Sequence, residues 1–179
     1  SNSIGTDSGT GALQLSLLAS GVKIGDEVIT TSNTYIATAL AISNVGAKPV
    51  FVDIDQDSFN INPGLIEEKI SDKTKAIIPV HLYGQCADME PILKIAKKNN
   101  LAVIEDACQS HGSTYNGEKC GSIGDIGCFS FYSSKNLSGF GNGGMAVSNN
   151  KKIIDIIKKL RDPDSNSLWL LQSRRTPAY

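Results

Sequence analysis

The sequence predicts an α/β fold in which a mostly parallel sheet carries helices on both faces, so that the domain has three layers. Short apolar segments typical of buried strands alternate along the chain with segments whose apolar residues recur at helical spacing. One strand segment, LAVIE at residues 101–105, has four consecutive apolar residues, as expected when both faces of a sheet are covered. No repeat or linker interrupts this pattern before about residue 161, so residues 1–161 are expected to form one domain and residues 162–179 an irregular tail or the start of a truncated C-terminal region.

The individual elements follow from local signals. Strands are expected at residues 28–30, 48–53, 76–80, 101–105, 127–132 and 145–148. Helices are expected at residues 12–20, 34–45, 63–70, 88–99 and 153–160. Gly21 ends the first helix, Pro63 occupies the first turn of the third, and Asp88 stands at the cap position of the fourth.

Composition excludes several partner classes. The 179 residues are 40% hydrophobic and 20% charged, which is ordinary for a globular domain. The 17 basic and 18 acidic side chains form no block of like charge, so neither a nucleic acid nor a membrane surface is an expected partner. No apolar run is long enough to span a bilayer and no signal-peptide pattern is present, which predicts a cytoplasmic protein.

The cysteines and histidines indicate no special site. Four cysteines lack CxxC spacing, and reduced thiols are expected in preference to disulfides in a cytoplasmic protein. His81 and His111 lack metal-ligand spacing with each other and with the cysteines, so no metal site is predicted.

The start of the first predicted helix is a candidate anion site. Residues 8–11 read Ser-Gly-Thr-Gly, which leaves free backbone N–H groups and a hydroxyl at the positive end of the helix dipole. Phosphate is the usual ligand of such a site. A simple helix cap by Ser8 or Thr10 explains the same letters equally well.

A second candidate lies at residues 129–145, FSFYSSKNLSGFGNGGM. A short apolar strand here is followed by Lys135 and then by a glycine-rich loop whose backbone can approach a ligand closely. This arrangement suits an amine held against a carbonyl compound. On this stretch alone, a solvated surface lysine is the simpler interpretation.

Asp106 completes the set, because it directly follows the LAVIE strand. In open α/β sheets, ligands bind beyond the carboxyl ends of the strands, which is where Asp106, Lys135 and the helix start are expected to lie. An anion site, a carboxylate and a nucleophilic lysine are the groups that pyridoxal 5'-phosphate (PLP) requires.

Six segments, in order, resemble the DegT/DnrJ/EryC1/StrS family of PLP-dependent sugar aminotransferases. The resemblance covers roughly residues 4–161 and implies the large domain of the aspartate aminotransferase fold, fold type I. The segments are IGTDSGTGALQLSLLASG, GDEVITTSNTYIATALAI, GAKPVFVDID, KAIIPVHLYGQCADM, VIEDACQSHGSTYNG and FSFYSSKNLSGFGNGG.

The resemblance implies roles for three residues around the reacting centre. Lys135 would be the Schiff-base lysine and later the base that moves a proton between substrate and cofactor. Asp106 would pair with the pyridine nitrogen of the cofactor, although a helix cap is its default role. Gln109 would hydrogen-bond the ring hydroxyl oxygen; taken alone it would be a surface amide.

The resemblance also implies contacts to the rest of the cofactor. Thr10, the Gly11 backbone and Ser130 match positions that contact the phosphate. Tyr35 matches the position of an aromatic residue that stacks on the cofactor ring, where a core aromatic would otherwise be expected.

Lysine at position 135 implies a transaminase, since related dehydratases carry histidine there. The residues KNL after FSFYSS resemble the motif of enzymes that aminate 3-keto sugars on thymidine diphosphate. The implied reaction moves an amino group from glutamate to a nucleotide-linked keto-deoxyhexose, in a homodimer with shared active sites.

Two features depart from the family pattern. Family members are considerably longer, with an N-terminal segment and a smaller C-terminal domain, so a shortened paralogue that holds the cofactor as a binding module without turnover is the alternative function. An asparagine from the neighbouring chain contacts the phosphate in the family, and Asn166 is only a weak match to it. Asn142 replaces an aspartate that is frequent in the family's glycine-rich turn.

Overall fold

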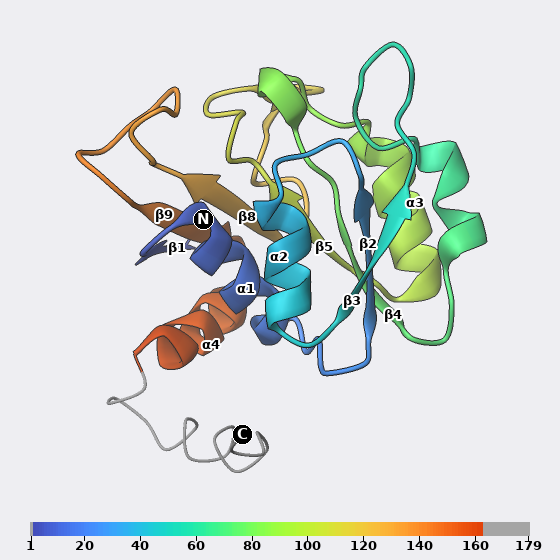
Figure 1. The fold of residues 1–179 in the computed structure, drawn as a ribbon, viewed down its shortest axis with the longest axis horizontal. Helices are drawn as coiled ribbons and strands as arrows, with labels where there is room; N and C mark the ends of the chain where they lie inside the picture. Colours follow the sequence, from blue (N-terminus) through green and yellow to red (C-terminus); the bar gives the residue numbers. More distant parts are fainter. Residues whose placement is uncertain (1, 163–179) are drawn as a thin grey trace.

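The computed structural model describes residues 2–162, which form a seven-stranded sheet in the order β1-β9-β8-β5-β4-β2-β3 (Figure 1). The seven strands are β1 (Asn2–Thr6), β2 (Glu27–Thr31), β3 (Lys48–Val52), β4 (Thr74–Ile78), β5 (Ala102–Asp106), β8 (Ile126–Ser130) and β9 (Gly144–Ser148). A separate short hairpin pairs β6 (Thr114–Tyr115) with β7 (Glu118–Lys119).

The sheet is mostly parallel, as the sequence predicts. Strands β3, β2, β4, β5 and β8 run parallel to one another, whereas β9 is antiparallel to both of its neighbours, β8 and β1. The edge strand β1 is not predicted from the sequence, because its letters NSIGT carry no run of strand formers. Its pairing with β9 is a tertiary contact between segments at opposite ends of the domain.

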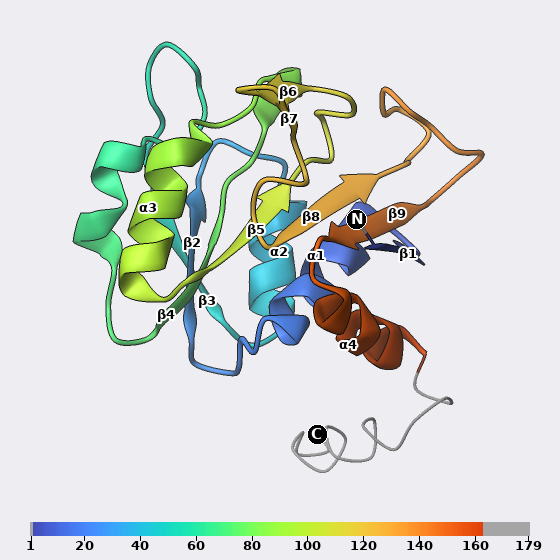
Figure 2. The same ribbon diagram turned by 180° about the vertical axis from the view of Figure 1, so that it is seen from behind.

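Helices cover both faces of the sheet, which confirms the three-layer prediction (Figures 1 and 2). Helices α1 (Gly9–Ala19), α2 (Ala37–Asn44) and α4 (Lys151–Arg161) share one hydrophobic core, to which they contribute Leu13, Leu17, Ala41, Ile42, Ile154 and Ile157. Helix α3 (Met89–Asn99) packs in the second core with Ile77 and Val103 of the sheet.

Two helix predictions are wrong in their extent. The helix expected at 34–45 begins only at Ala37, because the preceding residues form a loop, in which Thr34 shares a side-chain hydrogen bond with Thr38 of the first helical turn. The helix expected at 63–70 is two 3₁₀ turns, η1 (Pro63–Leu65) and η2 (Glu67–Lys69), whose N–H groups bond the third residue back. The irregular tail at 162–179 and Asn166 lie outside the described residues, apart from Asp162.

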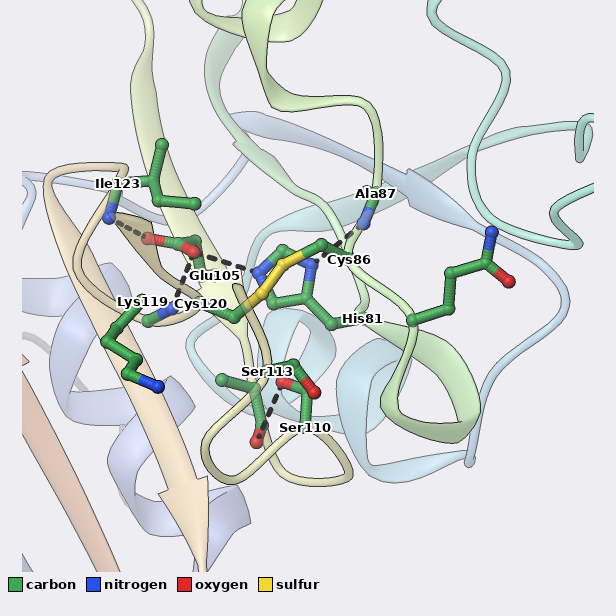
Figure 3. The surroundings of a disulfide bond; sticks show 12 residues. His81, Cys86, Ala87, Glu105, Ser110, Ser113, Lys119, Cys120 and Ile123 are labelled. Carbon is green, nitrogen blue, oxygen red and sulfur yellow. Dashed lines mark hydrogen bonds and ion pairs between the residues drawn. A yellow bond between two sulfur atoms is a disulfide. The ribbon is translucent and has the colours of Figure 1, made fainter. Parts of the chain in front are cut away.

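The prediction of reduced cysteines is wrong for one pair. Cys86 and Cys120 form a disulfide between Cα atoms 6.4 Å apart, although 34 positions separate them in the sequence (Figure 3). The fold brings together the loop after β4 and the end of the β6–β7 hairpin, and no local spacing reveals that approach. Cys108 and Cys128 are free thiols.

The described residues contain no helix long and apolar enough to cross a membrane.

Gly127 is a position where the packing demands glycine. A Cβ atom there would lie about 2.5 Å from the carbonyl carbon of Gly121. This carbon belongs to the backbone, so no change of side-chain rotamer can relieve the clash. We expect Gly127→Ala to lower the free energy of unfolding by about 1–3 kcal/mol. Gly5→Ala is the matched control, because nothing lies within 4 Å of its Cβ, and it should change stability by less than about 0.5 kcal/mol. Equal effects of the two variants in urea titrations would contradict this account.

Candidate active site

A cavity of about 520 Å³ opens at the carboxyl ends of the central strands. Asp106 is the last residue of β5 and Ser130 the last of β8, and these two strands are parallel neighbours. The volume lies within the range of small-molecule sites, roughly 300–1,000 Å³. The wall comes from the start of α1, the loop before α2, the segments after β5 and β8, and the residues just before β9; it includes Ser8, Gly9, Thr10, Thr34, Tyr35, Thr38, Asp106, Cys108, Gln109, Ser130, Tyr132, Ser134, Lys135, Asn142 and Gly143.

The start of α1 presents unpaired donors to this cavity. Ser8 is the N-cap, and its Oγ accepts a hydrogen bond of 3.0 Å from the Gly11 N–H. Within residues 2–162, the N–H groups of Gly9 and Thr10 have no acceptor, as expected for a first helical turn. A Cβ at Gly9 would lie 2.8 Å from both Cys108 Sγ and Ser130 Cβ, so glycine allows the helix start to approach β8. Free N–H groups at the positive end of a helix are suited to a phosphate.

Asp106 is buried, with 6% of its surface exposed, and both carboxylate oxygens are held. Oδ2 accepts a hydrogen bond of 2.8 Å from Thr38 Oγ1, and Oδ1 accepts one of 3.2 Å from the Cys108 N–H. The carboxylate is therefore fixed in orientation on the cavity wall.

Lys135 lies on the same wall, in the loop that follows β8. Its backbone N–H donates to Tyr132 O at 2.8 Å, which closes a turn over residues 132–135. Its ammonium makes no hydrogen bond or ion pair with any described residue. The amine is thus available to a ligand in the cavity.

Gln109, in the loop after β5, and Tyr35, in the loop before α2, both line the cavity. Gln109 Oε1 accepts a hydrogen bond of 3.0 Å from the Tyr83 N–H, so its NH₂ group is left as a donor. Tyr35 is 68% exposed and precedes α2, which rules out the core position that would otherwise be expected of an aromatic residue.

Of the seven residues singled out from the sequence, only Gly11 does not line the cavity. Its N–H is occupied by Ser8 Oγ, and Ser8 and Gly9 lie on the wall in its place. The sequence analysis missed Thr38, which orients Asp106. No local signal identifies it, because the two residues are 68 positions apart.

Cys108 also lines the cavity but is not a second nucleophile. Burial, together with the nearby Asp106 carboxylate, raises the pKa of the Cys108 thiol far above its ordinary value, so the thiol stays protonated.

The His111 ring contacts the rings of Phe129 and Phe131, at centroid distances of 5.5 and 5.7 Å, and burial lowers the pKa of its imidazole. Among the groups of this wall, Lys135 therefore remains the candidate amine nucleophile.

Comparison with known proteins identifies the family. The family model for the DegT/DnrJ/EryC1/StrS aminotransferases matches residues 1–169. The chain belongs to this family. The resemblance noted in the sequence is thereby confirmed, as is the fold.

Three relatives illustrate the membership. The chain is 52% identical to the dTDP-3-amino-3,6-dideoxy-α-D-galactopyranose transaminase of Aneurinibacillus thermoaerophilus, over 93% of this chain and 46% of that protein. It is 51% identical to the "Pleiotropic regulatory protein" of Geobacillus stearothermophilus, over 88% of this chain and 42% of that protein. The structure of NtdA from Bacillus subtilis, with bound cofactor PMP, superposes with a TM-score of 0.85 at 40% identity, covering 90% of this chain and 36% of that one.

The chain therefore spans less than half the length of these relatives. The cofactor of the family is pyridoxal phosphate, and the cavity suits it. A helix start with free N–H groups, a buried carboxylate and an unpaired lysine meet on one wall, which matches the phosphate, ring nitrogen and aldehyde of that cofactor.

Proposed function

We propose that this chain is the PLP-binding portion of an aminotransferase that moves an amino group from glutamate to a keto-deoxyhexose on a nucleotide. The observation that carries the proposal is that Lys135, Asp106 and the start of α1 line one cavity. These groups come from three separate segments, and a cofactor with an aldehyde, a ring nitrogen and a phosphate has one chemical partner for each.

Lys135 has two proposed roles, both of which use its unpaired amine. It holds the cofactor covalently, and after release it carries a proton between the substrate carbon and the cofactor. PLP itself supplies an electron-withdrawing ring that stabilises negative charge on the substrate carbon. Asp106 keeps the ring nitrogen protonated, and Thr38 holds the Asp106 carboxylate in the orientation that this requires.

The remaining proposed contacts position the ring and the phosphate. Gln109 donates from its NH₂ group to the ring hydroxyl oxygen, because its carbonyl oxygen is already held by Tyr83. Tyr35 stacks on the ring. Thr10 and Ser130 contact the phosphate, and Gly11 contributes indirectly by receiving the Ser8 cap.

The proposed sugar substrate is a dTDP-linked 3-keto-deoxyhexose. The Aneurinibacillus relative is named for a 3-amino sugar on dTDP, which supports this substrate class. Glutamate as amino donor and a cytoplasmic location belong to the same proposal.

We further propose that the active form is a homodimer with shared sites. Large apolar side chains gather at the mouth of the cavity, where Tyr35 and Tyr132 both line the wall and are 68% and 50% exposed. Leu137 and Phe140 are exposed on the following loop, which projects from the sheet between β8 and β9 (Figure 1). Burial of this surface against a second copy would remove it from water.

The test uses the purified chain mixed with PLP and then with glutamate. Binding should produce an absorption band, and borohydride trapping should attach a pyridoxyl group to Lys135, located by peptide mass spectrometry. Addition of glutamate should convert the cofactor to its amine form and release 2-oxoglutarate. A band that does not respond to glutamate would support the alternative, a cofactor-binding module without turnover. Absence of any band would overturn the proposal.

A further inference from the structure

The second chemical cluster of the described residues lies outside the cavity, around the disulfide of Cys86 and Cys120 (Figure 3). Cys86 belongs to the loop between β4 and α3, and Cys120 directly follows β7. His81 is adjacent: one of its ring nitrogens and the two sulfurs lie within 4.8 Å of one another. No spacing pattern in the sequence predicts that these three residues meet.

Two cysteines and a histidine are also the donor set of many zinc sites, but the hydrogen bonds of His81 argue against a metal here. His81 Nε2 lies 2.8 Å from Glu105 Oε2, and Nδ1 accepts a hydrogen bond of 3.1 Å from the Ala87 N–H. The Nε2–H group therefore donates a hydrogen bond to the Glu105 carboxylate, and the Nδ1 lone pair accepts one from the Ala87 N–H. Neither ring nitrogen is left to bind a metal ion. Thiol–disulfide chemistry between the two sulfurs is what the cluster supports.

The two ends of the disulfide enclose the segment that carries Gln109. On the Cys86 side, the Tyr83 N–H donates to Gln109 Oε1 at 3.0 Å, and Gly84 O accepts from Ser113 Oγ at 2.6 Å. On the Cys120 side, the Cys120 N–H donates to Ser113 O at 3.0 Å. Gln109 and Ser113 are thus held between two segments that the disulfide joins.

The loop on the Cys86 side has little regular structure, and hydrogen bonds hold it beside the crosslink: the Leu82 N–H donates to Asn60 Oδ1 at 3.0 Å, and Asn60 Nδ2 donates to Gln85 O at 3.1 Å. It contains only a short 3₁₀ turn, η3 (Leu82–Gly84), in which Tyr83 and Gly84 have positive φ angles of 54° and 89°. Tyr83 is 82% exposed, so side-chain burial does not fix it. The crosslink at Cys86 adds a covalent restraint to these hydrogen bonds, close to the N–H group that orients Gln109.

We propose that the Cys86–Cys120 disulfide is a redox-controlled clamp that sets the position of Gln109 in the cavity. The effect on the cofactor rests on the proposed function, in which Gln109 contacts the PLP ring. Oxidised, the clamp holds the Tyr83 N–H against Gln109 Oε1. Reduced, the loop at 82–87 loosens and Gln109 loses its fixed orientation.

The reductant is a dithiol. Its thiolate attacks Cys86 Sγ, the more accessible sulfur, since Cys86 is half-buried and Cys120 is 3% exposed. This step forms a mixed disulfide and releases Cys120 as a thiolate, which takes up a proton. The second thiol of the dithiol then closes its own disulfide and releases Cys86. Two electrons and two protons pass from the dithiol to the pair.

The test compares three samples of the full chain. The first is the oxidised chain, the second is the chain reduced by a phosphine that does not react with PLP, and the third is the Cys86→Ala/Cys120→Ala variant. Alkylation after unfolding should modify two cysteines in the oxidised chain and four in the reduced one. Hydrogen exchange should become faster at residues 82–87 and 109–113 on reduction, while residues 126–130 of β8 stay unchanged. The double variant should resemble the reduced chain and show no response to the phosphine.

The effect on the cofactor is measured as the dissociation constant of PLP. We expect this constant to rise about 3- to 10-fold when the disulfide is reduced, which corresponds to the loss of one hydrogen bond. In Gln109→Ala the two redox states should bind PLP equally. Unchanged hydrogen exchange, or equal PLP affinity of both redox states in the unsubstituted chain, would overturn the clamp. If PLP fails to bind in either state, the proposed function fails, and hydrogen exchange alone still decides the clamp. Stoichiometric zinc in the freshly isolated chain would also overturn it.

Discussion

Lys135→Ala is expected to abolish covalent attachment of PLP and to lower amino transfer from glutamate by at least about 10²–10⁴-fold, the usual worth of a positioned proton-transfer group. The physical reason is that Lys135 supplies the unpaired amine of the cavity, whereas Cys108 on the same wall is kept protonated. Borohydride trapping followed by mass spectrometry measures the attachment, and release of 2-oxoglutarate measures the transfer.

The fold should not suffer from this change. The Lys135 ammonium makes no hydrogen bond or ion pair with a described residue, so the free energy of unfolding should change by less than about 0.5 kcal/mol. Lys135→Arg, which keeps the charge but has no nucleophilic amine, should be as inactive as Lys135→Ala. Lys23→Ala, at an exposed lysine that does not line the cavity, is the control that should retain both activities. A pyridoxyl group trapped on another lysine in Lys135→Ala would refute the assignment.

Glu105→Gln is expected to lower the free energy of unfolding by about 1–3 kcal/mol, the cost of leaving buried hydrogen-bond donors without their acceptor. Glu105 is fully buried next to Asp106, and its carboxylate accepts hydrogen bonds from His81 Nε2 and from the N–H groups of Gly121, Ile123 and Gly124, at 2.6–2.8 Å. An amide of the same size replaces one acceptor oxygen by a donor, which then faces other donors.

Urea titration of Glu105→Gln against Glu118→Gln measures this effect. Glu118 is exposed on β7, and its substitution should cost less than about 0.5 kcal/mol. Equal midpoints for the two variants would show that the buried carboxylate does not stabilise the fold.

The same residue predicts how stability depends on pH. Burial alone would raise the pKa of Glu105, but the hydrogen bonds from His81, Gly124 and Gly121 outweigh it and hold the pKa below its ordinary value of 4.5. The folded state therefore favours the ionised form. Its contribution is complete above about pH 4.5 and is lost as the pH falls through the folded-state pKa. The unsubstituted chain should lose stability more steeply below that pH than Glu105→Gln does.

The strand and helix pattern of the chain was predictable because it depends on local periodicity. Val103, Ile104 and Glu105 of the predicted LAVIE strand are buried in β5, and α3 begins at Met89 directly after the predicted cap, Asp88. The errors fell where tertiary contacts override local preference. Asp88, for example, stands at the cap position but makes no capping bond, because its carboxylate accepts from the Tyr115 hydroxyl at 2.5 Å.

Sequence patterns were enough to predict that Asp106 and Lys135 meet in the cavity. Each follows a predicted strand, and parallel strands place their carboxyl ends at one edge of a sheet, whereas the strand before α1 was not predicted. Only the tertiary structure decided how those groups are held. The hydrogen bonds from Thr38 to Asp106 and from Tyr83 to Gln109 join residues that are 68 and 26 positions apart in the sequence. The disulfide between Cys86 and Cys120 joins residues that are 34 positions apart. Such contacts depend on how loops from different strands pack, and no periodic pattern along the chain encodes that packing.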